Sequence, residues 1–193
     1  MTPDEYLGFE RAAEIRHEYH DGELIAFAGA KREHILITGN THYRLTSQLL
    51  DTPCEVYMTD MRVKATPTAY VYPNVVVVCD EPMFADDEFD VLLNPTVIVE
   101  VLSPSTEILD RRDKLQYYGA LESVKDYLLI AQEKIRVDHY VKQSGSEWNL
   151  HVYTEPDDMI EIASIGCKLV LSEVYAKVKF SQKPTALPTV KEA

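Results

Sequence analysis

The most apolar segments of the chain are two short runs rich in β-branched residues. Residues 70–79 and 96–102 contain almost no polar side chain apart from Asn74 and Glu100. Strands that do not alternate between apolar and polar residues are buried on both faces, as in the centre of a sheet that helices cover. An alternating segment at 54–65 and a further apolar one at 126–131 add two more predicted strands.

Helices are predicted on both sides of these strands. The segments with helical periodicity of their apolar residues are 3–16, 31–50 and 110–121. From residue 31 to 131 the order is therefore helix, three strands, helix, strand. This order places a mixed sheet between helices and predicts an α/β fold.

The two ends of the chain add smaller elements. The turn Asp21-Gly22 predicts a hairpin over 16–28, and a second hairpin is predicted around Ser144-Gly145. Residues 159–175 are expected to form a short strand and a terminal helix. We expect one domain over 1–178, followed by a flexible tail over 179–193 that contains two prolines and little apolar content.

Composition agrees with a folded domain and limits the partners. The chain has 193 residues, 46% of them hydrophobic, which is enough for one core. The net charge of -13 argues against a protein that coats nucleic acid, although a small basic lining inside an acidic shell is compatible with a nuclease. The acidic segment Asp80 to Asp90, which includes Glu81, Asp86, Asp87 and Glu88, is interpreted as a solvated loop.

Location is predicted from what the sequence contains. No apolar run approaches the roughly 20 residues that span a bilayer, and the acidic N-terminus does not have the pattern of a signal peptide. The three cysteines, Cys54, Cys79 and Cys167, are widely spaced and odd in number. They are interpreted as buried thiols of a cytoplasmic protein. We expect no membrane partner, and a homodimer is the expected assembly.

Glu100 is the residue that points most directly to chemistry. It lies inside the apolar strand 96–102, and a buried carboxylate is costly unless it is paired or bound to a metal. Acids in apolar surroundings are often functional, so a site residue is favoured over a glutamate at the end of a strand. Pro73 fits the start of a strand, where its missing N–H costs nothing, and it places Asn74 at the entry to a neighbouring strand.

Several motifs together resemble a large bacterial family of restriction-endonuclease-like proteins of unknown function, which is placed in the PD-(D/E)xK nuclease superfamily. The similar segments are Asn94–Thr106 with Asp110, Lys114 and Tyr117, then His17–Tyr19 with Asp21–Glu23, and Tyr72-Pro73 before the valines. The resemblance covers residues 3 to 178. It implies a restriction-endonuclease-like core with an N-terminal helix and hairpin and C-terminal β additions.

The resemblance also implies a site. Glu100 corresponds to the second metal-binding acid, and Asn74 stands where the family pattern has an aspartate. Leu102 occupies the usual place of the lysine, so Lys114 would be the displaced lysine, with Glu18 as an additional acid. The implied cofactor is Mg²⁺ or Mn²⁺, which prefers hard oxygen ligands. The implied reaction is hydrolysis of DNA phosphodiester bonds.

Two alternatives remain open at this point. Asp60 is a second candidate for supplying the charge that Asn74 does not bring, although an ion pair with Arg62 or Lys64 on the same strand face explains it as well. The asparagine and the net charge of -13 also fit an inactive nuclease-fold protein that binds nucleic acid or another protein. The histidines His17, His20 and His34 match no zinc spacing and are interpreted as surface or capping residues.

Overall fold

The computed structural model describes residues 1–27 and 29–180, and a six-stranded mixed sheet forms their centre. The strand order is β11-β10-β9-β8-β6-β3, in which β8 and β9 are parallel and the other neighbours antiparallel. The six strands are β3 (Glu55–Met58), β6 (Val75–Val78), β8 (Val97–Leu102), β9 (Asp126–Ala131), β10 (Val137–Lys142) and β11 (Trp148–Tyr153). The predicted mixed sheet is therefore confirmed.

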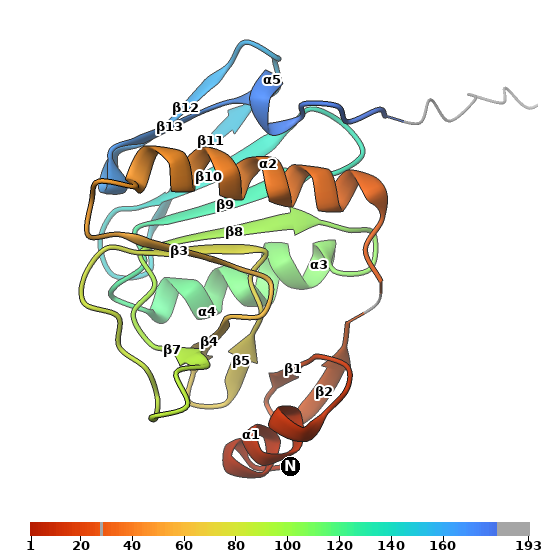
Figure 1. Cartoon of the computed structure of the whole chain (residues 1–193), viewed down its shortest axis with the longest axis vertical. Helices are drawn as coiled ribbons and strands as arrows, with labels where there is room; N and C mark the ends of the chain where they lie inside the picture. Colours follow the sequence, from red (N-terminus) through yellow and green to blue (C-terminus); the bar gives the residue numbers. More distant parts are fainter. Residues whose placement is uncertain (28, 181–193) are drawn as a thin grey trace, which may run out of the picture.

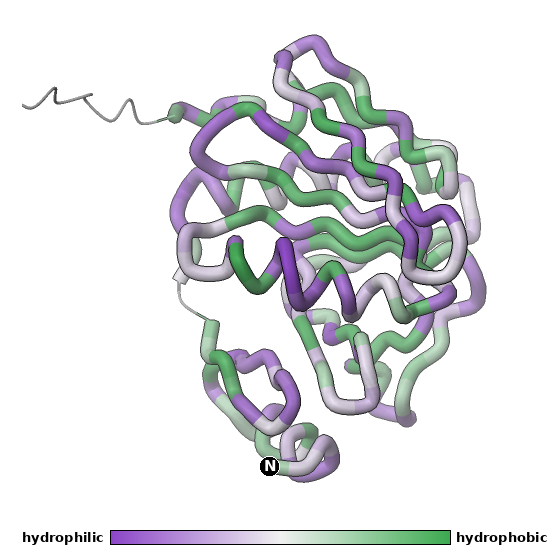
Figure 2. Tube along the Cα trace, turned by 180° about the vertical axis from the view of Figure 1, so that it is seen from behind, coloured by the Kyte–Doolittle hydropathy of each residue, from purple (hydrophilic) through white to green (hydrophobic). Residues whose placement is uncertain are grey.

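Helices pack on both faces of this sheet, as the strand composition predicted. The long helix α2 (Arg32–Leu49) packs against β3, β6 and β8, while α4 (Leu115–Ala120) belongs to the crossover between the parallel strands β8 and β9 (Figure 1). Hydrophobic residues follow the central strands in Figure 2. Val99 and Val101 join the core on the α2 side, and Ile98 and Leu102 join the core that includes α4. Glu100 falls between Ile98 and Leu102 on the α4 side because side chains alternate along a strand.

A smaller, five-stranded sheet has the strand order β2-β1-β5-β4-β7. It contains the predicted N-terminal hairpin, and β1 pairs with β5 so that Tyr19 lies opposite Tyr70. Its strands are β1 (His17–His20), β2 (Glu23–Ala26), β4 (Arg62–Thr66), β5 (Ala69–Val71) and β7 (Val91–Leu92). Figure 1 shows helix α1 (Pro3–Ala12) and this hairpin at the opposite end of the molecule from the C-terminal additions.

The predicted strands 54–65 and 70–79 are each broken, and their halves lie in different sheets. Strand β3 pairs in the large sheet and β4 in the small one, and β6 and β5 divide in the same way. Thr59 has a φ of 48°, a left-handed conformation that interrupts the first strand, and Pro73 has no N–H for the ladder of the second. The prediction of two continuous strands was wrong because the pattern of apolar residues continues through both bends.

Other boundaries also differ from prediction. The first helix ends at Ala12 rather than at residue 16, and the helix predicted from Asp110 begins at α3 (Glu107–Leu109) and passes through a π-helical turn over Asp110–Lys114. The C-terminal segment forms a hairpin of β12 (Met159–Ile162) and β13 (Cys167–Val170) before the short helix α5 (Leu171–Val174), where one strand was predicted. The predicted tail lies outside the described residues except for 179 and 180.

The cysteine prediction was wrong for two of the three residues. Cys54 and Cys79 form a disulfide between the ends of β3 and β6, whereas Cys167 is a buried free thiol as predicted. The strand register explains the pairing, since Glu55 lies opposite Val78 and the next pair along the ladder is Cys54 and Cys79. With a disulfide present, the cysteines no longer support a reducing compartment. No helix in the described ranges is long and apolar enough to cross a membrane.

Removing this disulfide is expected to lower the free energy of unfolding by about 3 kcal/mol, because the bond closes a loop of 25 residues in the unfolded chain. Urea unfolding of the wild type and of the double variant Cys54→Ser/Cys79→Ser measures the difference. Dithiothreitol should shift the wild-type transition and leave that of the double variant in place. Three reactive thiols in the denatured, unreduced wild type would contradict the prediction.

Candidate active site

The ammonium group of Lys114 lies among three carboxylates in the interior of the protein. Its Nζ atom is 2.9 Å from Oε1 of Glu18, 2.9 Å from Oε1 of Glu100 and 3.1 Å from Oδ1 of Asp110. All four residues are at most 4% exposed. Three segments therefore meet here: the N-terminal hairpin, the central strand β8 and the π-helical turn before α4.

Local structure explains why Asp110 and Lys114 point to the same place. They are four residues apart at the two ends of the π-helical turn, so their side chains lie on one face of it. Single π turns inside helices are frequent at functional sites. The Oδ1 atom of Asp110 accepts no hydrogen bond within the described residues, despite its 3.1 Å contact with the Lys114 nitrogen.

Glu18 is held by several hydrogen-bond donors. Its Oε1 accepts the backbone N–H of Tyr72 at 3.0 Å, and its Oε2 contacts Nε2 of His20 at 3.0 Å. Burial alone raises the pKa of Glu18, but the charge of Lys114 and these hydrogen bonds outweigh burial and lower the pKa to about 2. Glu18 is therefore an ionised, fixed partner that holds Lys114 in place.

Glu100 has the opposite electrostatic balance. Among the residues that the structure describes, only Lys114 Nζ, at 2.9 Å, and the hydroxyl of Tyr118, at 3.2 Å, donate to its Oε1. Burial, together with the negative charges of Asp110 and Glu18, outweighs the attraction of Lys114 and raises the pKa of Glu100 to about 8. For Lys114 itself, burial lowers the pKa, but the three carboxylates outweigh burial and raise it well above the usual value. The lysine is therefore protonated.

Asn74 lies beside this cluster and has defined partners. Its Oδ1 accepts the backbone N–H of Val101 at 2.7 Å, and its Nδ2 lies 3.0 Å from Nε2 of His34. The backbone pairing between β6 and β8 ends at Val75 and Val99. The hydrogen bond from the Val101 N–H to the Asn74 side chain extends this pairing to the part of β8 that carries Glu100. Asn74 stays a predicted metal ligand, since an amide oxygen that accepts one hydrogen bond has a second lone pair.

The structure brings most of the predicted site residues together and leaves one outside. Glu18, Glu100 and Lys114 are in direct contact, whereas the side chain of Asp60 is 74% exposed and pairs with Arg16 at 3.4 Å. Asp60 therefore contributes nothing to the cluster. It lies in the bend after β3 rather than on a strand, so the ion-pair ladder predicted with Arg62 and Lys64 is not formed.

Sequence reasoning missed four residues of this region, namely Asp110, Tyr118, His20 and His34. The histidines were taken for surface or capping residues, but His20 is 8% exposed and bonded to Glu18, and burial lowers the pKa of His34. For Asp110 a signal was present in the chain: a spacing of four residues from Lys114 places the two on one helix face. The acid was instead read as part of the helix start and of the family motif, without a role in the site.

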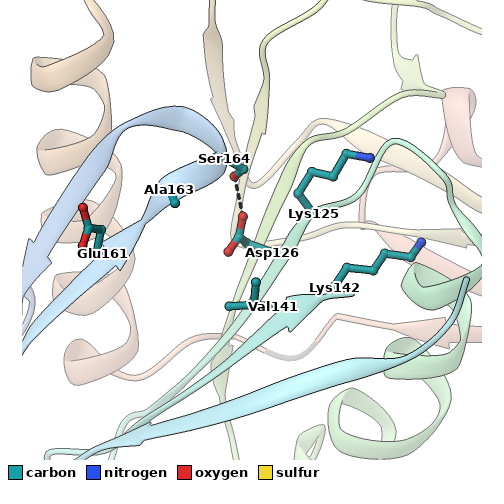
Figure 3. A pocket seen from close by; sticks show the side chains of 7 residues that line it. All are labelled: Lys125, Asp126, Val141, Lys142, Glu161, Ala163 and Ser164. Carbon is teal, nitrogen blue, oxygen red and sulfur yellow. Dashed lines mark hydrogen bonds between the residues drawn. The ribbon is translucent and has the colours of Figure 1, made fainter. Parts of the chain in front are cut away.

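A second group of buried polar residues lies on the α2 side of the sheet. Figure 3 shows Asp126 with Ser164, which donates a hydrogen bond to it from the segment after β12, and His139 contacts the other oxygen of Asp126 at 2.6 Å. The nearby Lys125 and Lys142 donate to backbone carbonyls of residues 122 and 121. The hydrogen bond from Ser164 attaches the C-terminal hairpin to β9, and the contact of His139 with Asp126 joins β10 to β9, which gives the group a structural role.

Comparison with solved structures defines the class of fold. The chain superposes with a TM-score of 0.75 on the crystal structure of a protein from Anabaena variabilis described as "a putative nuclease belonging to DUF820", over 91% of this chain and 97% of that one, at 18% sequence identity. At this identity the likeness concerns the fold alone. The protein therefore has a restriction-endonuclease-like fold, as the sequence predicted.

Sequence comparison identifies the family. The model of the Uma2 family, described as "Putative restriction endonuclease", matches residues 3–172, so the chain belongs to the Uma2 family. Two uncharacterised proteins of Synechocystis sp. strain PCC 6803 are similar to it. One is 31% identical over 93% of this chain and 94% of its own length, and the other is 36% identical over 78% and 85%. The predicted family is confirmed.

Proposed function

We propose that the protein is a metal-dependent nuclease that hydrolyses DNA phosphodiester bonds at the cluster around Lys114. The observation that carries the proposal is the contact of one buried lysine with Glu18, Glu100 and Asp110 inside a restriction-endonuclease-like fold. Membership of the Uma2 family supports the same reaction class. The cytoplasmic location and the homodimer stay predictions from the sequence.

The residues present fit a divalent cation by their chemistry. Within residues 1–27 and 29–180, no three His, Cys, Asp or Glu side chains are arranged to hold a metal ion on their own. Magnesium, however, is usually bound by one or two carboxylates together with water and substrate phosphate. Glu100 and Asp110 provide these carboxylates, and Oδ1 of Asp110 accepts no hydrogen bond in the described part of the chain. Together with the amide oxygen of Asn74, they are the groups that would hold the ion.

Charge supports the same assignment. When all three acids are ionised, Lys114 neutralises only one of them, and the raised pKa of Glu100 is the consequence of this excess. A bound cation would supply Lewis-acid stabilisation of the phosphate and activation of a water molecule. An ionised Glu100 is the form that binds such an ion, so cation binding is expected to release a proton from Glu100 near neutral pH.

The remaining groups position this centre. Glu18 fixes Lys114, and Tyr118 donates to Glu100, so both reacting side chains have one defined orientation. The Lys114 ammonium is suited to stabilise negative charge that develops on a phosphate during hydrolysis. Because the four charged residues are at most 4% exposed, a phosphate reaches Lys114 only after side chains around the cluster move.

The proposal is tested by calorimetric titration of Mg²⁺ and Mn²⁺ into the wild type, Glu100→Gln and Asn74→Asp, followed by cleavage assays on plasmid DNA. We expect the wild type to bind the ion, Glu100→Gln to lose binding, and Asn74→Asp to bind at least about tenfold more tightly, because a carboxylate adds charge to the site. DNA cleavage should follow the same order and stop with EDTA.

The exposed variant Asp60→Asn is the matched control, since it removes an acid outside the cluster and should leave binding and cleavage unchanged. If the wild type binds neither ion and only Asn74→Asp does, the protein is an inactive nuclease-fold protein that acts by binding. If Glu100→Gln binds the ion as well as the wild type does, Glu100 is not a ligand.

A further inference from the structure

A pocket of about 530 Å³ opens at the carboxyl ends of the parallel strands β8 and β9. Leu102 and Ala131, the last residues of the two strands, form part of its wall. Figure 1 shows the end of β8 leading into α3, whose Glu107 lines the same pocket. In α/β proteins this end of a parallel pair is a preferred position for ligands, and the volume lies in the range of small-molecule sites.

The pocket adjoins the cluster around Lys114 without being part of it. Leu102 is two residues beyond Glu100 on β8, a distance of about 6.6 Å along a strand. Arg111, which lines the pocket, is three residues before Lys114 on the π-helical turn. A strand of nucleic acid with one phosphate at Lys114 would therefore have its neighbouring nucleotide within reach of this pocket.

Three cations and two acids line the pocket of a protein whose overall charge is -13. The cations are Arg111, Lys134 and Arg136, and the acids are Glu107 and Glu133. Both arginines are paired with the buried Asp138, whose carboxylate lies 2.6 Å from Nη1 of Arg111 and 2.9 Å from Nε of Arg136. Arg111 also contacts Glu107 at 2.8 Å. Each guanidinium has five N–H donors, so both have more donors than these contacts use.

Gln132 supplies the second observation. It follows β9, lines the pocket and is only 5% exposed, yet its Oε1 atom has no hydrogen-bond partner within the described residues. A buried acceptor without a partner costs about 1–3 kcal/mol, so such groups in a folded protein call for an explanation. Because Oε1 has almost no accessible surface, a ligand N–H donor would satisfy it once the Gln132 side chain turns its amide oxygen toward the pocket.

We propose that this pocket binds one nucleotide of the nucleic-acid strand next to the phosphate at Lys114. The cations take the phosphate group, and Oε1 of Gln132, turned toward the pocket, accepts from an exocyclic amine of the base. The assignment rests on the proposed nuclease function for the identity of the strand. Nucleotide binding in this pocket does not require a bound metal ion, because none of the pocket residues belongs to the cluster of acids around Lys114.

The test is NMR titration of the full chain in EDTA with 2′-deoxyadenosine 5′-monophosphate and, separately, with inorganic phosphate. We expect saturable binding of the nucleotide, weakened about three- to tenfold in Gln132→Leu through the loss of one hydrogen bond. The same variant should bind inorganic phosphate as the wild type does. It should also be at least as heat-stable, since it removes an unpartnered buried acceptor.

Lys134→Gln should weaken the binding of both the nucleotide and inorganic phosphate. In binding of a labelled 12-nucleotide DNA, this substitution should also lower the slope of log affinity against log salt concentration by about 0.7–1. Lys168→Gln, which removes an exposed lysine on β13, is the matched control and should change neither the ligand affinities nor the salt dependence of DNA binding. Nucleotide binding that is absent, or equal in Gln132→Leu and wild type, overturns the assignment even if DNA is cleaved. Binding with the expected pattern in a protein that cleaves no DNA refutes the nuclease function and leaves the pocket assigned.

Discussion

Replacement of Lys114 by methionine is expected to lower the free energy of unfolding by about 3–5 kcal/mol at pH 7 and to abolish DNA cleavage. Lys114 is the cation that contacts Glu18, Glu100 and Asp110, each at most 4% exposed. Without it, buried carboxylates face one another, and removal of one partner of a buried ion pair has a cost of this size. Methionine keeps the length of the side chain, so lost packing contributes little.

The pH dependence separates the electrostatic effect from packing. At acid pH the carboxylates left without Lys114 take up protons, so the difference in stability between Lys114→Met and wild type should shrink as the pH falls from 7 to 4. Urea unfolding at several pH values measures this difference in the free energy of unfolding, and Lys125→Met, which replaces an exposed lysine, is the control. A constant loss of stability at all pH values would show that the lysine acts by packing, and full cleavage activity would remove it from the proposed mechanism.

The central part of the site was predictable because its signals are local and strong. Glu100 interrupts an apolar strand, and a buried carboxylate there is expected to be functional or to pair with a cation. The family pattern then suggested Lys114 and Glu18. Contact between Lys114 and Glu18 depends on the N-terminal hairpin reaching the central sheet through strand β5. No spacing in the sequence encodes that contact, so the role of His20 stayed hidden until the fold placed it. Tyr118 was missed although it lies four residues after Lys114, a spacing that places the two side chains on one helix face.

The errors in the fold share a physical cause. The alternation of apolar residues reports which face of a strand is buried, but it does not report which sheet a strand joins. Residues 54–65 and 70–79 keep their pattern through the bends at Thr59 and Pro73 because apolar side chains on both sides of each bend pack against a core, even though β3 is only partly buried. The disulfide between Cys54 and Cys79 was missed for a related reason: it depends on the register of β3 against β6, which the spacing of the cysteines does not reveal.

The two glutamates of the cluster are expected to affect stability in opposite directions when each is replaced by glutamine. The pKa of Glu18 is lowered from 4.5, so its ionised form stabilises the fold above pH 4.5, and this contribution is lost as the pH falls through the lower, folded-state value. Glu18→Gln should therefore lose about 3 kcal/mol at pH 7. The pKa of Glu100 is raised from 4.5, so the wild type loses stability as the pH rises from 4.5 through the folded-state value of about 8.

Glu100→Gln avoids that loss and should be about 1–3 kcal/mol more stable than the wild type at pH 8, with no difference at pH 4. Its DNA cleavage should nevertheless fall by about 10²–10³-fold, because the amide replaces a metal-binding carboxylate. Urea unfolding at pH 4, 6 and 8 and cleavage rates at pH 8 measure both quantities on the same samples. A variant that is stabilised and inactive would show that Glu100 is kept at the expense of stability, as is usual for functional groups. Equal destabilisation by both substitutions at pH 8 would instead mean that Glu100 and Glu18 serve alike as structural partners of Lys114.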